Sequence, residues 1–526
     1  MSRVSAFLTA WVVLATTTQA FALSPQLTAS SDTVKIFVAT GESLRWLTAY
    51  PLASACEPNT GDYYFYGQGV ENTWSNFLLS EIAGGFSCRI KAGARGAMAG
   101  LAGRNVSLLI SSEEGVSGAV IQGLGRNPGR PQLRFLTPSA AACVSTPVPA
   151  GYIPQWRCSD LSWQRPMFGV SEVSPDLVSG LNVYGIDNPA DGGQDNKLHG
   201  RADAMQRIYG IAVNPALYRA MQAAQGLPQD NAAAHRPSIA RAVAASYFTG
   251  SLSAGPMGLG WQYLVGGDHA LAQSQVNVCR SRNGSGVQAL LYKEFLGYPC
   301  SLTALAAVDE SFTDAAQPGL AGIGTSATIH VVEGAGENAM EQCLGTAQSA
   351  GAFAIGLLSI GRIETDLDSK VWTHRFVKLD GVAPDAASAK LGMGLLADVS
   401  VRWDEAFVAT LPGAVRTLIN GYGALLGSAD ILGATFGNSA RLGVLAIADN
   451  KGNQYRSGSA ASVAYTGATW QTHSCQPRSV VAGWPGNQPA INVNSIGNDS
   501  AQALPLNPVT PQQVMPHAPE RTLPIR

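Results

Sequence analysis

The chain has 526 residues, of which 46% are hydrophobic, 8% aromatic and 13% charged, with 58 glycines and 29 prolines. This length exceeds the usual size of one hydrophobic core, and the composition excludes a disordered chain, so we expect a folded protein of two domains or two lobes. The formal net charge of −2 supplies no basic field, which excludes nucleic acid and an acidic membrane surface as predicted partners.

The first 22 residues are typical of a secretory signal peptide. Arg3 precedes an apolar run at residues 6–14, and the tripeptide AFA at residues 20–22 is a small-x-small cleavage site. No cysteine stands at this site, and no later stretch reaches about 18 strongly apolar residues. We therefore expect cleavage after residue 22 and a mature protein that is periplasmic or secreted and not embedded in a membrane.

Short apolar segments that end in polar turns alternate along the chain with segments of helical periodicity. The predicted strands lie at residues 34–39, 106–112, 168–175, 209–213, 275–279, 328–334, 351–361 and 375–384. The predicted helices begin near Ser43, at the Asn214-Pro215 turn, after Arg236 with an end at Gly250, and within residues 288–297 and 339–348. This alternation favours an α/β architecture with a largely parallel sheet.

All eight cysteines follow the predicted signal peptide, and none belongs to a CxxC pair of the kind that indicates zinc binding or redox chemistry. An even number of cysteines in an oxidising compartment predicts disulfides. Many connectivities are open, and local pairing is the simplest. It joins Cys56 to Cys88, Cys143 to Cys158 and Cys279 to Cys300, and leaves Cys343 to pair with Cys475.

The stretch CRSRNGSGVQALLYKEF has the features of an anion-binding loop. Gly284, Ser285 and Gly286 lie between a predicted strand and the start of a predicted helix. Free backbone N–H groups, the positive end of the helix dipole and a serine hydroxyl converge there, and Arg280 or Arg282 would add a charge-assisted contact. The alternative is a plain glycine turn with solvated arginines.

Motifs for enzymatic chemistry are absent from the sequence. It contains no GxSxG, no GxxxxGK[ST] and no HExxH pattern, and its seven histidines form no close pair. The acidic clusters at residues 191–196 and 364–368 do not follow the EF-hand spacing and are interpreted as solvated loops. We therefore predict no catalytic residue, no metal site and no cofactor.

Four stretches carry a resemblance in chain order: FVATGESL, ISSEEGVSG, FGVSEVSPDL and RNGSGVQA. They are similar to segments of the type II periplasmic solute-binding proteins, in particular the phosphate-binding proteins of ABC importers and their divergent exported relatives. The resemblance implies ligand contacts at Ser43 and Leu44, Gly115 and Ser117, Glu172, and the loop of Gly284, Ser285 and Gly286 with its flanking arginines. It implies that Glu172 accepts a hydrogen bond from a protonated oxyanion.

The sequence departs from the family pattern at three of these positions. Glu172 stands where phosphate binders have Asp, Val287 stands where they have a last hydroxyl donor, and the arginine position is Ser281, with Arg280 and Arg282 on either side. Each missing donor leaves an unmatched group at a cost of about 1–3 kcal/mol. The longer carboxylate reaches further into the site, which would exclude phosphate or adapt the site to another ligand.

The resemblance implies a two-lobed α/β fold of mixed, mostly parallel sheets with an interlobe cleft. We expect residues 31–200 and 370–478 to form one lobe, residues 201–369 the other, and residues 484–526 a Pro- and Asn-rich disordered tail. The predicted function is non-covalent capture of a small, phosphate-like anion in the cleft, with hinge closure and a transporter or secretion partner.

Two alternatives remain open at this stage. The first is the same fold with a degenerate cleft, acting as a surface, matrix or secretion-associated interaction protein, which the departures from the family pattern favour. The second is an exported hydrolase whose catalytic residues match no motif. Stabilisation by oxyanions would separate binding from the first alternative, and turnover of an ester, glycoside or phosphoester panel would support the second.

Overall fold

A computed structural model describes most of the chain between residues 23 and 446. The described residues are 23–41, 44–67, 83–112, 132–147, 153–172, 200–250, 264–265, 276–297, 306–310, 329–334, 336–362, 364, 374–390, 394–427 and 444–446. The predicted signal peptide and the predicted tail lie outside these ranges. Within them, no helix has the length and apolar character needed to cross a membrane.

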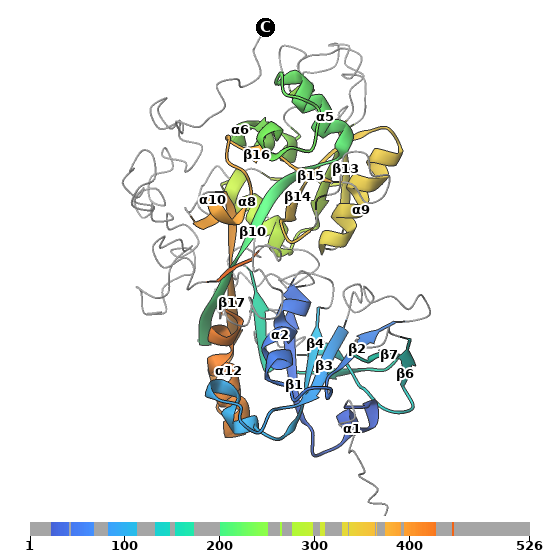
Figure 1. Ribbon diagram of the computed structural model, residues 1–526, viewed down its shortest axis with the longest axis vertical. Helices are drawn as coiled ribbons and strands as arrows, with labels where there is room; N and C mark the ends of the chain where they lie inside the picture. The colour runs from blue at the N-terminus through green and yellow to red at the C-terminus, as the bar shows by residue number, and fades with distance from the viewer. Residues whose placement is uncertain are drawn as a thin grey trace, which may run out of the picture.

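The protein has two lobes that share one continuous mixed sheet (Figure 1). The strand order is β13-β12-β14-β10-β17-β9-β1-β4-β3-β2-β7-β6, with β15 and β18 paired to β10. The first three strands belong to the upper lobe in Figure 1, which we call lobe 2, and the strands from β9 onward belong to lobe 1. This arrangement confirms the predicted two-lobed α/β fold.

Lobe 1 is built on three parallel strands, β9 (Phe168–Ser171), β1 (Val34–Thr40) and β4 (Asn105–Ser111). These strands read as nearly continuous apolar runs because both faces of the sheet are covered. The remaining strands of this lobe are β2 (Asp62–Tyr66), β3 (Ala83–Arg89), β5 (Leu133–Leu136), β6 (Cys143–Thr146), β7 (Gln155–Cys158) and β8 (Leu161–Gln164).

Two helices close the core of lobe 1. Side chains of α2 (Arg45–Ala55) and α12 (Gly413–Leu426) are buried in one cluster with side chains of β1 and β4. The Tyr422 hydroxyl of α12 donates a hydrogen bond to the Thr48 carbonyl of α2 over 2.5 Å. The shorter helices near this lobe are α1 (Pro25–Ala29), η2 (Gly96–Leu101) and α11 (Glu405–Val408).

Lobe 2 has three parallel strands in the order β13 (Ile329–Gly334), β12 (Val276–Ser281) and β14 (Phe353–Ser359). Helix α9 (Gly336–Ser349) leads from β13 to β14, and α8 (Gly286–Phe295) follows β12. The other elements are α5 (Pro215–Ala224), η7 (Ala233–His235), β11 (Ser238–Ile239), α6 (Arg241–Phe248), β15 (Arg375–Phe376), β16 (Lys378–Leu379) and α10 (Ala386–Lys390).

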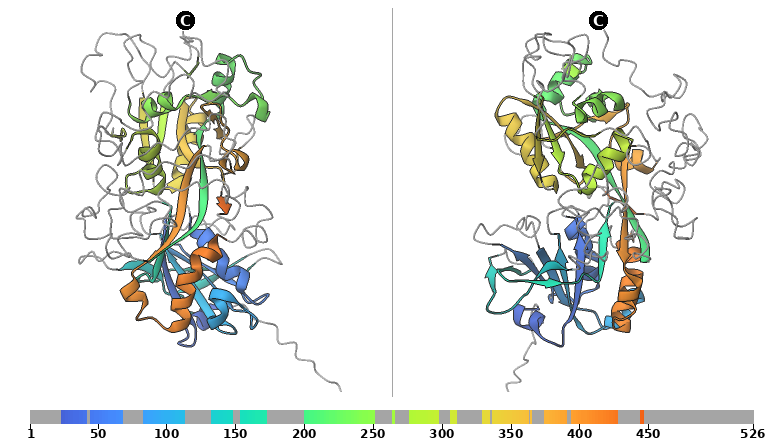
Figure 2. Two further views of the ribbon diagram at one scale, coloured as in Figure 1. Left: turned by 90° about the vertical axis from the view of Figure 1, so that its left-hand side faces the viewer. Right: turned by 180° about the vertical axis from the view of Figure 1, so that it is seen from behind.

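Two long antiparallel strands connect the lobes. β10 (Gly200–Val213) and β17 (Leu395–Trp403) pair from Gly200↔Trp403 to Tyr209↔Leu395, with an irregularity near Asp203. β17 also pairs with β9 of lobe 1, and β10 pairs with β14 of lobe 2, so the two strands run through both lobes (Figure 2). The short strand β18 (Val444–Ala446) lies against β10.

Two of the predicted disulfides are confirmed. Cys56 bonds to Cys88, with their Cα atoms 5.7 Å apart, and Cys143 bonds to Cys158, with their Cα atoms 4.1 Å apart. The second pair lies directly across the antiparallel strands β6 and β7. Local pairing is therefore correct in lobe 1, where each bond joins elements that are neighbours in the fold.

The predicted bonds Cys279–Cys300 and Cys343–Cys475 are wrong. Cys279 of β12 bonds to Cys343 of α9, 64 residues later, with a Cα–Cα distance of 5.9 Å. The reason is topological: α9 connects β13 to β14, packs across the sheet and brings its buried face over the strand between them, β12. Cys300 and Cys475 lie outside the described residues.

Candidate functional site at the junction of the lobes

The three parallel strands of lobe 1 run in one direction, so their carboxyl ends lie at the same edge of the sheet, the edge that faces lobe 2 (Figure 1). Ala39 of β1 is in register with Ser111 of β4 and with Gly169 of β9. Ser111 ends β4, and Ser112 and Glu172 directly follow the ends of β4 and β9, so all three lie at this edge of the sheet. All three are buried. Within the described part of the chain, neither serine hydroxyl has a hydrogen-bond partner. Open α/β sheets bind ligands at this kind of edge.

The predicted anion loop has the expected local structure. Strand β12 ends at Ser281, Gly284 has φ 86°, and Ser285 is the N-cap of α8, where its hydroxyl oxygen accepts a hydrogen bond from the Gln288 backbone N–H over 3.0 Å. A left-handed φ explains the glycine at 284. The Gln288 side-chain amide is fully buried, and neither of its polar atoms has a partner among the described residues.

A carboxylate of the chain itself lies on the first turn of α8. A Cβ atom added to Gly286, the first residue of the helix, would lie 2.5 Å from Cγ and 2.8 Å from Cδ of Glu172. Ala289 on the same turn packs in a cluster with Ala39 and Leu109 of lobe 1. The start of α8 therefore contacts lobe 1 directly, and Glu172 places negative charge where the helix dipole favours it.

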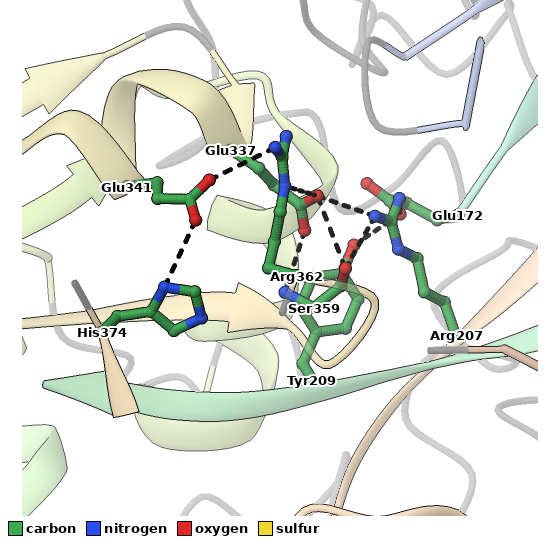
Figure 3. A network of polar contacts seen from close by, with 8 residues as sticks. All are labelled: Glu172, Arg207, Tyr209, Glu337, Glu341, Ser359, Arg362 and His374. Carbon is green, nitrogen blue, oxygen red and sulfur yellow. Dashed lines mark hydrogen bonds and ion pairs between the residues drawn. The ribbon is translucent and has the colours of Figure 1, made fainter. Parts of the chain in front are cut away.

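Two residues of the connecting strand β10 hold the Glu172 carboxylate (Figure 3). The Tyr209 hydroxyl donates a hydrogen bond to Glu172 Oε2 over 2.6 Å, and Arg207 Nη1 lies 3.5 Å from the same oxygen. Burial is the main reason that the pKa of Tyr209 is raised well above its ordinary value, so this phenol stays a hydrogen-bond donor at physiological pH.

Arg207 is anchored more tightly to lobe 2. Its Nη2 donates to Glu337 Oε2 over 2.7 Å and to Ser359 Oγ over 2.8 Å. The other oxygen of Glu337 accepts the Ser359 backbone N–H over 2.9 Å, and Arg362 Nε lies 3.4 Å from Oε2. Burial opposes ionisation of Glu337, but the two arginines and the Ser359 hydrogen bonds hold its pKa below the usual value.

The network continues outward in lobe 2 (Figure 3). Arg362 Nη1 lies 3.3 Å from Glu341 Oε2, and the fully buried His374 has Nδ1 3.4 Å from Glu341 Oε1. Across the described part of the chain, no group of three or more His, Cys, Asp or Glu side chains could hold a metal ion. The site consists of hydrogen-bond donors and alternating charges.

The two arginines predicted to flank the ligand make contacts within lobe 2. Arg280 is buried, donates to the Val308 carbonyl and to Asn283 Oδ1 (2.5 Å), and lies 3.4 Å from Glu333 Oε1. These contacts fix the loop before α8. Arg282, which is partly buried, donates its backbone N–H to the Gly334 carbonyl over 3.2 Å.

The remaining predicted contacts from lobe 1 are mostly outside the described residues. Ser43, Gly115 and Ser117 fall there. Leu44 directly precedes α2, and its side chain is buried in the core of lobe 1. Of the predicted set, the structure brings Glu172 together with Gly286 and the Ser285 N-cap.

Sequence reasoning missed the residues that hold Glu172. Arg207 and Tyr209 are two positions apart on β10, and alternate residues of a strand share one face. An arginine within the apolar run MQRIYGIAV was the available signal. Glu337 had a weaker signal: it lies two residues before the helix predicted at 339–348 and falls in the first turn of α9 in the structure, where an acidic residue also fits an ordinary helix start.

Comparisons with known proteins give structural neighbours only. No family model matches the chain, and no curated protein matches it. A phosphate ABC transporter substrate-binding protein from Clostridium perfringens, solved with bound phosphate, aligns at 9% identity and TM-score 0.36 over 78% of this chain and 99% of its own.

Two further structures align at similar levels. A phosphate transport receptor from Vibrio cholerae has 12% identity and TM-score 0.28 over 52% of this chain and 78% of its own. A possible phosphate-binding protein from Planctomyces limnophilus has 8% identity and TM-score 0.30 over 80% of this chain and 96% of its own. Because all three TM-scores lie below 0.5, we base the functional assignment on the contacts described above.

Proposed function

We propose that this chain is an exported binding protein that captures a small anionic solute, phosphate or another oxyanion, without covalent chemistry. The solute would lie between the carboxyl-end edge of lobe 1 and the first turn of α8 in lobe 2. The observation that carries the proposal is the position of Glu172, whose carboxylate lies against Gly286 at the start of α8. The space beside Gly286 therefore accommodates an oxyanion, and in this structure that oxyanion is the carboxylate of Glu172.

The surrounding groups fit such a ligand. Ser285 uses its lone pair on the Gln288 backbone N–H, which leaves the hydroxyl hydrogen for an acceptor. The buried hydroxyls of Ser111 and Ser112 add donors from lobe 1. In this proposal Ser43, Gly115 and Ser117 complete the set from the loops of lobe 1.

In the same proposal Arg280 acts by fixing the loop before α8, because its guanidinium is already shared between Val308, Asn283 and Glu333. Among the described residues, the charged groups placed at the start of α8 are the Glu172 carboxylate and, 3.5 Å from it, the Arg207 guanidinium. A bound oxyanion would be stabilised by neutral donors and the helix dipole, which cost little reorganisation, with the positive charge of Arg207 nearby.

The connecting strands supply the mechanism of capture. β10 and β17 run through both lobes as one antiparallel pair, so a small change along this pair would alter the separation of the lobes as a hinge does. Delivery of the captured solute to a transporter is the corresponding role. No bond needs to be made or broken, and the proposed protein is not an enzyme.

A second candidate function is a surface or secretion-associated interaction module of the same fold. The observation that favours it is the same carboxylate, since Glu172 fills the position that a solute would need. The two functions differ in one consequence. A binding protein must release Glu172 in exchange for its ligand, whereas an interaction module keeps it in place at any anion concentration.

Thermal unfolding with added anions tests the proposal. We expect phosphate or sulfate, but not chloride at matched ionic strength, to raise the melting temperature of the mature protein by mass action, equivalent to about 2.7 kcal/mol at 100 times Kd. Ser285→Ala should lose most of the rise. The matched control is Ser139→Ala, which also removes a hydroxyl that accepts a backbone N–H three residues on, but lies next to β6 at the outer edge of lobe 1.

The outcomes separate cleanly. A rise in wild type and in Ser139→Ala that is lost in Ser285→Ala supports the proposal and its site. No rise with any tetrahedral or carboxylate anion overturns the proposal and leaves the interaction module.

A further inference from the structure

We infer that Glu172 is a latch and an internal competitor: in the unliganded molecule its carboxylate occupies the anion-binding turn of α8 and holds the lobes together. Glu172 follows directly after β9 of lobe 1. Its contacts with Gly286, Tyr209 and Arg207 all lie in lobe 2 or on the connecting strand. The lobes cannot separate at this point without withdrawing the carboxylate.

The charge arrangement lets Glu172 leave while the rest of the network stays intact. Arg207 lies 3.5 Å from Glu172 but 2.7 Å from Glu337, and it also donates to Ser359. When Glu172 withdraws, Arg207 therefore keeps its buried ion pair with Glu337. An uncompensated buried cation, which would be strongly destabilising, does not arise. Tyr209 then offers its hydroxyl to whatever replaces the carboxylate.

Because the Glu172 carboxylate already occupies the first turn of α8, a ligand has to displace it, and this narrows the class of ligands that can bind. This step rests on the proposed function. A group held on the same chain competes at an effective concentration of about millimolar or higher. A free monocarboxylate offers the same charge and the same two acceptor oxygens without that advantage. A tetrahedral dianion offers more charge to the helix dipole and more acceptors to Ser285 and Tyr209, so the structure favours small dianionic oxyanions over monocarboxylates.

Removing the carboxylate while supplying it in trans tests the latch. Glu172→Ala deletes a fragment that corresponds to acetate, and small-angle X-ray scattering reports the separation of the lobes. We expect the unliganded variant to have a larger radius of gyration than wild type, and acetate at tens of millimolar to restore the wild-type value, while chloride at equal ionic strength does not. Glu57→Ala, a loss of the same charge from a more exposed site on lobe 1, should match wild type throughout.

A second variant removes the contact and keeps the charge. Gly286→Ala places a methyl group where the Glu172 side chain lies, at 2.5 Å from its Cγ, and the φ of Gly286 is not in the left-handed region that would oppose alanine. We expect Gly286→Ala to have the same enlarged radius of gyration as Glu172→Ala. Acetate should not restore the wild-type value, because the methyl group fills the space where the carboxylate would bind. This separates a latch from a general loss of stability.

The possible results decide between the two proposals. If both variants keep the wild-type radius of gyration, the latch is overturned, while stabilisation of wild type by phosphate would still stand. If the variants expand and acetate compacts only Glu172→Ala, the latch is supported even where phosphate produces no stabilisation. Expansion that acetate does not reverse in Glu172→Ala would overturn the claim that the turn of α8 holds a carboxylate.

Discussion

Asp62 gives the chain a built-in dependence of stability on pH. It begins β2 in lobe 1 and is fully buried. Its Oδ1 accepts a hydrogen bond from Trp156 Nε1 over 2.8 Å, and its Oδ2 has no partner among the described residues. Burial raises the pKa of Asp62 from 3.8 to about 7, although the Trp156 hydrogen bond partly opposes this shift.

The direction of the effect follows from proton uptake on folding. Because the folded pKa exceeds the unfolded one, the stabilising contribution of the protonated acid is fully present below about pH 4 and is lost as the pH rises towards 7. At about 1.4 kcal/mol for each pKa unit, the difference between 3.8 and about 7 corresponds to about 4 kcal/mol.

The substitution Asp62→Asn should remove this dependence. Asparagine stays neutral, and its Oδ1 still accepts the Trp156 hydrogen bond. We therefore expect the variant to be close to wild type at pH 4 and more stable than wild type by about 2–4 kcal/mol at pH 8. Urea unfolding of the disulfide-intact protein at both pH values measures the two differences, with Asp32→Asn, an exposed carboxylate of the same lobe, as the control.

A stability difference between Asp62→Asn and wild type that is equal at pH 4 and pH 8 would refute the reasoning. It would mean that the carboxyl reaches water or a donor in the native protein, so that burial does not decide its ionisation.

Three further substitutions test the packing and the charges of the molecule. Replacing both Cys279 and Cys343 by serine opens a 64-residue loop and should lower the free energy of unfolding by about 2–4 kcal/mol in non-reducing urea titrations. Arg207→Met leaves Glu337 with weaker compensation and should cost about 3–5 kcal/mol, part of which the added Glu337→Gln should recover in a double-mutant cycle. Gly427→Ala puts a methyl group 2.9 Å from a backbone carbonyl carbon of β10, so its melting temperature should fall clearly below wild type, and an unchanged value would contradict this packing.

The alternating elements of the fold could be predicted because their signals are local. The predicted strand at 209–213 ends β10, and Asn214 caps α5 by accepting the Leu217 backbone N–H over 3.2 Å, with Pro215 as the first helical residue. Proline at this position and asparagine at the cap are features that one short segment displays. Such signals do not depend on the rest of the chain.

The antiparallel part of lobe 1 lacked a local signal. β3 has the sequence AGGFSCR, which has no clear alternation and contains two adjacent glycines. A Cβ atom on Gly85 would lie 3.1 Å from the Leu108 carbonyl oxygen of β4, so this glycine allows close approach of two strands. In the sequence alone, a glycine that allows a neighbouring strand to approach closely cannot be told from a glycine in a turn. The Cys279–Cys343 bond was missed for a similar reason, since it depends on which strand a crossover helix covers.

Prediction from the sequence was also incomplete at the candidate site, where the difference of one methylene group between Asp and Glu decides the contact. The sequence identified Glu172 and the glycine-rich loop and interpreted them as opposite sides of a space for a ligand. In the structure the two touch. An aspartate would end about 1.5 Å short of this position, and a side chain on residue 286 would exclude the carboxylate. Glu172 and Gly286 therefore form one contact, which requires both the longer acid and the absence of a side chain at 286. The sequence does not reveal this pairing, because the contact depends on the fold placing the end of β9 against the start of α8.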